Sequence, residues 1–315
     1  MEWNLIILII SVVILFLFSI RKFSEEVQKV SGKRFKDFLK KLTRTPLRGT
    51  FIGAFVTSIV QSSSATTVIL VGLVSAGLIS FRNSLGVIFG ANIGTTITSQ
   101  LIALNLTSIA PFFIILGFLI ELFGRKFKLL GRPIFYFGLV FFSLSLISTY
   151  MEPLASNPYF ISFLSSTSNI LIAIFLGFLF TFFVQSSSIT SGLAVVLVGG
   201  GLLNFTQAIG IIFGANIGTT TTAIFSSWGL NKEAKKTALA HFLFNILGVL
   251  MFLPFLFQFE NLVTALGGSA QQQVANAHLI FNLVSAGIFL IFISPFEKLV
   301  EKLSDKFSNL IKKIF

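Results

Sequence analysis

Long apolar stretches separated by short polar breaks run along almost the whole chain. A helix needs roughly 20 apolar residues to cross a bilayer, and seven stretches come close to that length. The predicted membrane-spanning helices cover residues 3–20, 83–106, 108–123, 133–150, 207–228, 237–257 and 277–295. The first lacks the basic region that precedes the apolar part of a signal peptide, so we interpret it as a retained helix. The pattern predicts an all-α membrane protein.

Two further apolar segments, residues 47–80 and 170–203, are interrupted near the middle by polar residues. The interruptions read VQSSSATT (residues 60–67) and VQSSSITS (residues 184–191). The apolar arms on either side hold about 14 to 16 residues, which is short for a full crossing. Each segment is therefore predicted to be a re-entrant helical hairpin with QSSS at its tip. Two full crossings remain open, because they would also start and finish on one side.

The two hairpin segments belong to an internal duplication. Gln61 has its counterpart at Gln185, 124 residues later, and the same offset holds along both segments. In an ungapped comparison of residues 53–96 with residues 177–220, 24 of 44 positions are identical. A shared bias toward apolar residues would not keep one exact spacing over this length, so the segments are two copies of one unit.

Composition and charge agree with a membrane protein. Hydrophobic residues make up 54% of the 315 residues and charged residues 11%, so lipid must solvate the apolar surface. The absence of cysteine excludes disulfides, thiolate metal sites and cysteine nucleophiles. The net charge of +12 comes from basic side chains near the ends of the predicted helices, and the 99 residues between Arg132 and Lys232 carry none. The charge therefore sets topology, and nucleic acid is not an expected partner.

Basic clusters mark cytoplasmic loops, which predicts a multi-pass protein of the cell (inner) membrane with its N-terminus outside and its C-terminus cytoplasmic. Residues 21–45 mix apolar side chains with Lys and Arg. We predict an amphipathic helix on the inner membrane surface there, with a plain basic connector as the alternative. Basic segments flank the first hairpin and none flank the second. The copies are therefore expected to enter the membrane from opposite sides.

This path divides the chain into four expected parts. They are residues 1–46, an N-terminal transmembrane helix with the basic segment; residues 47–150, the first repeat; residues 151–258, the second, inverted repeat; and residues 259–315, the last transmembrane helix with a basic cytoplasmic tail. Inverted-topology repeats with broken helices are typical of secondary transporters, whose substrate site lies near the middle of the membrane.

A second shared stretch follows each hairpin: GVIFGANIGTT at residues 86–96 and GIIFGANIGTT at residues 210–220. Its glycines are four residues apart, which favours close helix packing. The polar side chains of Asn92, Thr95 and Thr96 need partners in hydrocarbon. We therefore predict an unwound transmembrane helix, whose freed carbonyls and side-chain oxygens could coordinate a hard cation such as Na⁺.

The QSSS tips suit an anion. Serine hydroxyls, a glutamine amide and the first N–H groups of the following helix form a neutral receptor for a tetrahedral oxyanion. Because fixed positive charge is absent from the tips, the anion needs a mobile cation, which favours cation symport. Proton coupling normally uses an intramembrane carboxylate or histidine. The predicted helices offer Glu121, His241 and His278; the two histidines occur in AHFLFN and AHLIFN and are expected to form interhelical hydrogen bonds, so Na⁺ is favoured.

The paired QSSS hairpins, each followed by GANIGTT, and the AHFLFN phrase resemble the type II sodium-dependent phosphate cotransporter family over most of residues 47–295. The resemblance implies a non-enzymatic, bacterial-type transport core that imports inorganic phosphate with co-transported Na⁺ and uses no organic cofactor. For phosphate it implies Gln61, Ser62, Ser63, Ser64, Gln185, Ser186, Ser187 and Ser188. For sodium it implies Thr66, Asn92, Thr95, Thr96, Thr190, Asn216, Thr219 and Thr220.

Three alternatives compete with this interpretation. Another anion, such as sulfate, arsenate or a carboxylate, could be carried with Na⁺ by similar serine-rich tips. A passive anion channel would leave the cation-suited oxygens unexplained. An intramembrane serine hydrolase would need a serine elbow such as GxSxG, and the residues before Gly192 do not fit it.

Overall fold

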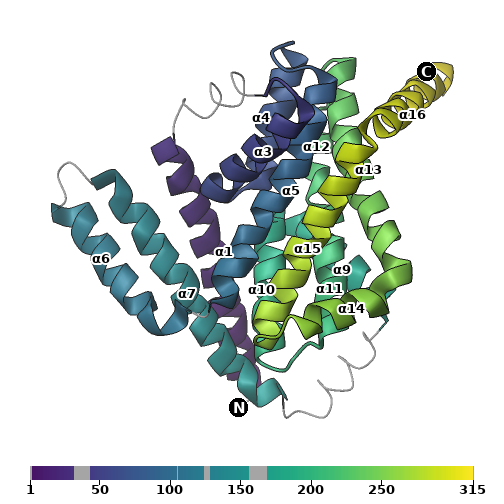
Figure 1. Ribbon diagram of the computed structural model, residues 1–315. Helices are drawn as coiled ribbons and strands as arrows, with labels where there is room; N and C mark the ends of the chain where they lie inside the picture. Colours follow the sequence, from purple (N-terminus) through teal and green to yellow (C-terminus); the bar gives the residue numbers. More distant parts are fainter. Residues whose placement is uncertain (1, 32–42, 105, 124–127, 156–168, 315) are drawn as a thin grey trace.

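The computed structural model describes residues 2–31, 43–104, 106–123, 128–155 and 169–314, and every regular element in these ranges is helical (Figure 1). The α-helices are α1 (Glu2–Ser31), α3 (Pro46–Val60), α4 (Ser63–Ser75), α5 (Phe81–Ala103), α6 (Ala110–Phe123), α7 (Lys128–Ala155), α9 (Ile170–Val184), α10 (Ser187–Gly199), α11 (Phe205–Gly218), α12 (Thr220–Ser226), α13 (Lys232–Phe252), α14 (Leu256–Ala265), α15 (Ala270–Ile291) and α16 (Ile293–Ile314). Two short 3₁₀ helices are η1 (Leu106–Ile109) and η2 (Leu253–Phe255).

Seven helical stretches within the described residues are long and apolar enough to cross a membrane. They are Asn4–Val30, Phe81–Ala103, Leu106–Phe123, Leu129–Ile147, Phe205–Ser226, Lys232–Ala265 and Ala270–Ile291. Each overlaps one of the seven predicted crossings. The prediction of an all-α, multi-pass membrane protein is therefore confirmed.

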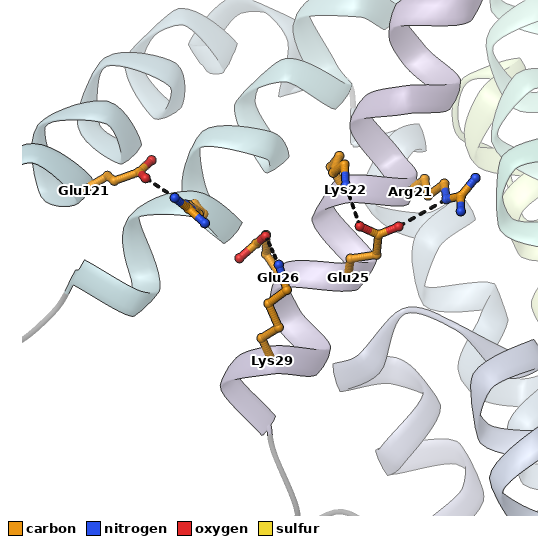
Figure 2. Close-up of polar contacts among 7 residues, drawn as sticks. Arg21, Lys22, Glu25, Glu26, Lys29 and Glu121 are labelled. Atoms are coloured by element: carbon orange, nitrogen blue, oxygen red, sulfur yellow. Dashed lines mark hydrogen bonds and ion pairs between the residues drawn. The ribbon is translucent and has the colours of Figure 1, made fainter.

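The N-terminal helix is longer than predicted. Residues 21–31 continue α1 without a break, so this part of the predicted amphipathic segment is not a separate surface helix. Of the rest of that segment, residues 32–42 lie outside the described residues. Figure 2 shows how the charges near the end of α1 are paired along the helix: Arg21 and Lys22 with Glu25, and Lys29 with Glu26. Such pairing neutralises charge locally and lets the apolar helix continue.

Each hairpin segment forms two short helices joined at the QSSS stretch. α3 and α9 have 15 residues each, and α4 and α10 have 13 each, fewer than a full crossing requires. Gly77 and Gly201 follow α4 and α10 with positive φ angles of 68° and 70°. Glycine allows this left-handed conformation without a steric penalty, so both copies stop at the same place.

Close backbone packing explains the glycines spaced four apart. A Cβ atom on Gly86 would lie 1.9 Å from Pro46 O, and one on Gly90 would lie 2.0 Å from Thr50 O. Both glycines are on α5 and both neighbours are on α3, so the two helices run parallel in direct backbone contact. In the second copy Gly214 of α11 would meet Ile174 O of α9 in the same way, at 1.9 Å. The packing interpretation is confirmed.

The predicted unwound helix is wrong for the first copy. α5 passes through GANIGTT without interruption, because its polar side chains bond within the helix: Asn92 Nδ2 donates to Ile88 O at 3.0 Å and Thr95 Oγ1 to Ala91 O at 2.9 Å. Internal bonds of this kind satisfy polar groups without freeing carbonyls. In the second copy only Thr219 separates α11 from α12.

A cluster of phenylalanines ties both copies to α13 and α15. Phe89 of α5 packs on Phe244 of α13 at 4.7 Å between ring centroids, and Phe213, its counterpart 124 residues later, packs on Phe281 of α15 at 4.6 Å. Phe244 and Phe281 are 37 residues apart, the same offset that separates AHFLFN from AHLIFN. The helices α13 and α15 are therefore matched partners of the two copies.

The helices α13 and α15 run in opposite directions. Phe244, near the middle of α13, contacts Phe289 near the end of α15, whereas Phe252 at the end of α13 contacts Phe281. Figure 1 shows α13 and α15 within the larger group of helices, with α6 and α7 set to one side.

Two polar contacts fix where α5 and α11 begin. Arg82 at the start of α5 forms an ion pair with Glu297 and a 3.0 Å hydrogen bond with Ser294, both just after α15. Thr206 at the start of α11, which is 124 residues after Arg82, donates to Glu260 in α14, just after α13. Because α13 and α15 are antiparallel, α5 and α11 begin at opposite ends of this pair.

Candidate functional site

The backbone reverses at the glutamine of each QSSS stretch; residues 61–64 are called the first tip and residues 185–188 the second tip. Gln61 and Gln185 have φ angles of 55° and 59°, and no other described non-glycine residue has a positive φ. A side chain in this conformation costs free energy, and such residues occur preferentially at functional sites. Both tips carry the same strain at the same residue.

A pair of threonines joins the two arms of each hairpin beneath its tip. Thr57 Oγ1 donates to Thr66 Oγ1 at 3.0 Å, and Thr181 Oγ1 lies 2.5 Å from Thr190 Oγ1. All four side chains are buried. Each buried hydroxyl pair links the two arms of its hairpin and so helps to hold them at one separation.

The two tips meet. Ser64 of the first tip donates to Gln185 O of the second at 3.3 Å, and its Oγ lies 3.1 Å from Thr219 Oγ1. Ser188 of the second tip lies 3.5 Å from Thr98 of α5. Residues 90 or more positions apart in the chain therefore form one polar cluster around both QSSS stretches.

Each glutamine side chain is held by a threonine that the sequence analysis missed. Thr98 Oγ1 donates to Gln61 Oε1 at 2.7 Å, and Thr222 Oγ1 donates to Gln185 Oε1 at 2.8 Å. Thr98 and Thr222 keep the 124-residue offset but lie just beyond the window that was compared. Extending the comparison by two residues would have found this signal.

The tips are polar but carry no charged side chain. The helices α4 and α10 begin at Ser63 and Ser187, so the positive ends of both helix dipoles lie at the cluster. Ser62 caps α4 by accepting from Ala65 N, whereas Ser186 makes no side-chain cap on α10. Within the described residues no group of three His, Asp or Glu side chains could hold a metal ion. The cluster is thus suited to an anion through hydroxyls and N–H groups.

The residues expected to bind sodium fall into two groups. Thr66, Thr190 and Thr219 contact the tips or their threonine pairs. The others lie within helices following the tips, where the Thr96 hydroxyl donates to Ile93 O of α5 and the Thr220 hydroxyl at the start of α12 donates to Ile217 O of α11. These hydroxyls are the donors in their bonds, so their oxygens keep lone pairs for a cation.

The two asparagines of the GANIGTT stretches are both buried. Asn92 bonds within α5, whereas the side-chain nitrogen of Asn216 has no hydrogen-bond partner among the described residues. The repeat is therefore not exact in its polar contacts.

The two histidines of the matching phrases are also buried but differ in their partners. His278 Nδ1 lies 2.9 Å from Ser99 Oγ on α5, which is the interhelical hydrogen bond expected of a membrane histidine. Within the part of the chain that the structure describes, neither ring nitrogen of His241 has a hydrogen-bond partner. Ala223, which lies 124 residues after Ser99, has no hydroxyl to offer in the second copy.

Comparison with known proteins identifies the family. Residues 15–149 and 151–292 each match the family model described as Na⁺/Pi-cotransporter. The chain belongs to this family. One match ends and the other begins near the middle of the chain, in keeping with the duplication in its sequence. The resemblance drawn from QSSS and GANIGTT is confirmed.

Several relatives are similar over much of this cotransporter-family chain. The uncharacterized protein YqeW of Bacillus subtilis is 32% identical over 275 residues, covering 84% of this chain and 87% of that protein. The putative inorganic phosphate export protein YjbB of Salmonella typhimurium is 30% identical over 244 residues, covering 76% of this chain but only 45% of the relative.

A human relative matches over a shorter region. Sodium-dependent phosphate transport protein 2B is 40% identical over 101 residues, which is 31% of this chain and 15% of the human protein. No solved structure matches the chain.

Proposed function

We propose that the protein is a secondary active transporter that carries inorganic phosphate into the cell together with Na⁺. The observation that carries the proposal is the meeting of two neutral, serine-rich helix starts in one partly buried cluster. Phosphate would be bound by Gln61–Ser64 and Gln185–Ser188 through hydroxyl and N–H donors. Family membership and the relatives named as phosphate transport proteins support this choice of anion over sulfate or a carboxylate.

We propose that the two copies have inverted topology in the membrane, with α3–α4 and α9–α10 as re-entrant hairpins. The short helices and the starts of α5 and α11 at opposite ends of the α13–α15 pair support this arrangement. Inverted repeats place one substrate site between two related halves, so access can alternate between the two sides.

Sodium has two roles in this proposal. It neutralises the anion, because the tips contain no Lys or Arg, and it couples transport to the Na⁺ gradient. Thr66, Thr190 and Thr219 are the favoured ligands because they lie at the tips. Asn92, Thr95, Thr96, Asn216 and Thr220 are secondary candidates. Because α5 is continuous, its backbone carbonyls are not free to bind Na⁺ in the first copy. Side-chain oxygens would have to bind the ion there.

Export is a second candidate function. The YjbB relatives, named as putative inorganic phosphate export proteins, favour it. The same site could serve both directions, since direction follows from the coupled gradients.

Proteoliposomes containing the purified protein test both candidates. We expect labelled phosphate to accumulate only with an inward Na⁺ gradient, and unlabelled phosphate to compete more strongly than sulfate or a dicarboxylate. Flux that ignores Na⁺ would instead indicate a passive channel. Phosphate efflux that Na⁺ does not influence would favour a Na⁺-independent exporter.

A further inference from the structure

Two threonines outside both QSSS stretches make the same contact in each copy. Thr98 is on α5 and Thr222 is on α12, and their hydroxyls donate to the side-chain oxygens of Gln61 and Gln185. The distances are 2.7 and 2.8 Å. A contact preserved in both halves of a duplicated chain is a property of the site, and not of one local packing arrangement.

The chemistry of the carboxamide fixes the direction of each bond. Gln61 Nε2 donates to Ser58 O, and Gln185 Nε2 donates to Phe182 O. A backbone carbonyl can only accept, so the nitrogen must face it and the oxygen must face the threonine. The threonine hydroxyl is then the donor. Each carboxamide nitrogen has a second hydrogen, which at Gln185 has only a long 3.4 Å contact to the Thr221 hydroxyl.

We infer that Thr98 and Thr222 are positioning residues, which orient the two glutamines so that a carboxamide N–H, and not the oxygen, is presented to the bound anion. Without the hydroxyl the carboxamide oxygen would lose its donor, and a half-turn of the amide would bring an acceptor toward a negatively charged ligand. The inference rests on the proposed phosphate site and adds two residues to its support.

Thr98 makes a contact for which Thr222 has no counterpart among the described residues. Thr98 Oγ1 also lies 3.5 Å from Ser188 Oγ of the second tip, so it connects the two tips. Among the contacts of the described residues, Thr222 has no matching bond to the first tip. Loss of the hydroxyl is therefore expected to have a larger effect at Thr98 than at Thr222.

Isosteric variants test the inference in proteoliposomes. Thr98→Val removes the hydroxyl and keeps the shape, and Thr98→Ser keeps the hydroxyl. At saturating Na⁺ we expect Thr98→Val to raise the KM for phosphate about tenfold, the loss of one hydrogen bond, with little change in the Na⁺ concentration for half-maximal uptake. Thr98→Ser should restore the wild-type KM. Thr50→Val is the matched control, because the Thr50 hydroxyl bonds to Pro46 O within α3.

The Gln61→Leu variant provides a second measurement. If Thr98 acts through Gln61, adding Thr98→Val to Gln61→Leu should raise the KM no further, and full additivity would overturn the inference. An unchanged KM in Thr98→Val, or failure of Thr98→Ser to restore it, would also overturn the inference. None of these three results would affect the proposed function. The proposed function would be overturned only if the wild-type protein showed no Na⁺-driven phosphate uptake.

Discussion

Ser63 and Ser187 are the residues at which the second helix of each hairpin begins, and both side chains are buried. Their hydroxyls stand next to the first N–H groups of α4 and α10, where a tetrahedral anion would collect several donors. Their neighbours Ser64 and Ser188 contact the opposite half of the molecule. At the scale of single residues, the middle serines are therefore the best-placed direct donors.

Substitution of these serines should weaken phosphate binding. Ser63→Ala and Ser187→Ala each remove one donor, and we expect a loss of about 1 to 2 kcal/mol in binding free energy. Competition by unlabelled phosphate in the uptake assay measures this loss. Ser143→Ala is the control, because the Ser143 hydroxyl bonds within its own helix α7, to Leu139 O and Val140 O. Unchanged affinity in both tip variants would place the phosphate elsewhere.

A second prediction at this scale concerns the unpartnered His241. Ala223→Ser would place a hydroxyl at the position equivalent to Ser99, the partner of His278. We expect the free energy of unfolding to rise by about 1 kcal/mol, because a buried ring nitrogen gains a hydrogen bond. Thermal unfolding in detergent measures the change. The gain should disappear in a His241→Phe background; a gain that persists would assign the effect to packing.

Sequence reasoning found the tips but missed the threonines that hold them. QSSS is conspicuous because four polar residues interrupt apolar helices. A single threonine such as Thr98 is not, because threonine is common in membrane helices and can bond to its own backbone. Only the packing of α3 against α5 places Thr98 beside Gln61.

At the scale of elements, the parallel contacts of α3 with α5 and of α9 with α11 position each tip. The glycines of GANIGTT and of the preceding turn allow these contacts, since a Cβ atom at any of them would overlap atoms of the partner helix. The tip then lies against the second half of α5 or against α12, beside the threonines.

Enlarging one of these glycines should destabilise the protein. Gly90→Ala would place a Cβ 2.0 Å from Thr50 O, so we expect the free energy of unfolding to fall by about 3 kcal/mol. Gly72→Ala in α4 is the matched control, because a Cβ there meets nothing within 4 Å. Alanine favours a helix more than glycine, so the control should be neutral or slightly stabilised. Equal stability of the two variants would contradict the packing model.

The same contacts explain why the predicted unwound helix is wrong. Polar residues and glycines at membrane depth are compatible with a break, and the sequence alone does not separate this from an intact helix. In α5 the glycines serve packing and the polar side chains of Asn92 and Thr95 bond to the preceding turn. The polar side chains are therefore satisfied without a break in the helix.

At the scale of the whole molecule, α13 and α15 contact the two copies as a matched, antiparallel pair. Residues 240–266 align with residues 277–303 without gaps, at the same 37-residue offset. The alignment pairs Glu260 with Glu297. These two glutamates contact the starts of α11 and α5. The pairing extends the duplication beyond the hairpins and makes both copies contact equivalent surfaces.

The orientation of this arrangement can be tested because the natural chain has no cysteine. Trp228 and Leu266 are exposed residues on either side of the α13–α14 crossing. In intact cells we expect a membrane-impermeant maleimide to label Leu266→Cys, and to label Trp228→Cys only after permeabilisation, because basic residues follow Trp228. The unsubstituted chain is the control. The opposite pattern would reverse the proposed orientation.

The sequence by itself determined the helical class, the seven apolar crossings, the duplication and the family, because these depend on length, spacing and residue type. Tertiary structure decided which polar groups meet. Ser64 reaches Gln185 and Thr98 reaches Gln61 only after the helices pack. It also decided that α5 stays intact. An intact and an unwound helix differ in their hydrogen bonds, and the local sequence pattern is compatible with both. Local physics specifies the elements, and contacts between residues far apart in the chain specify the site.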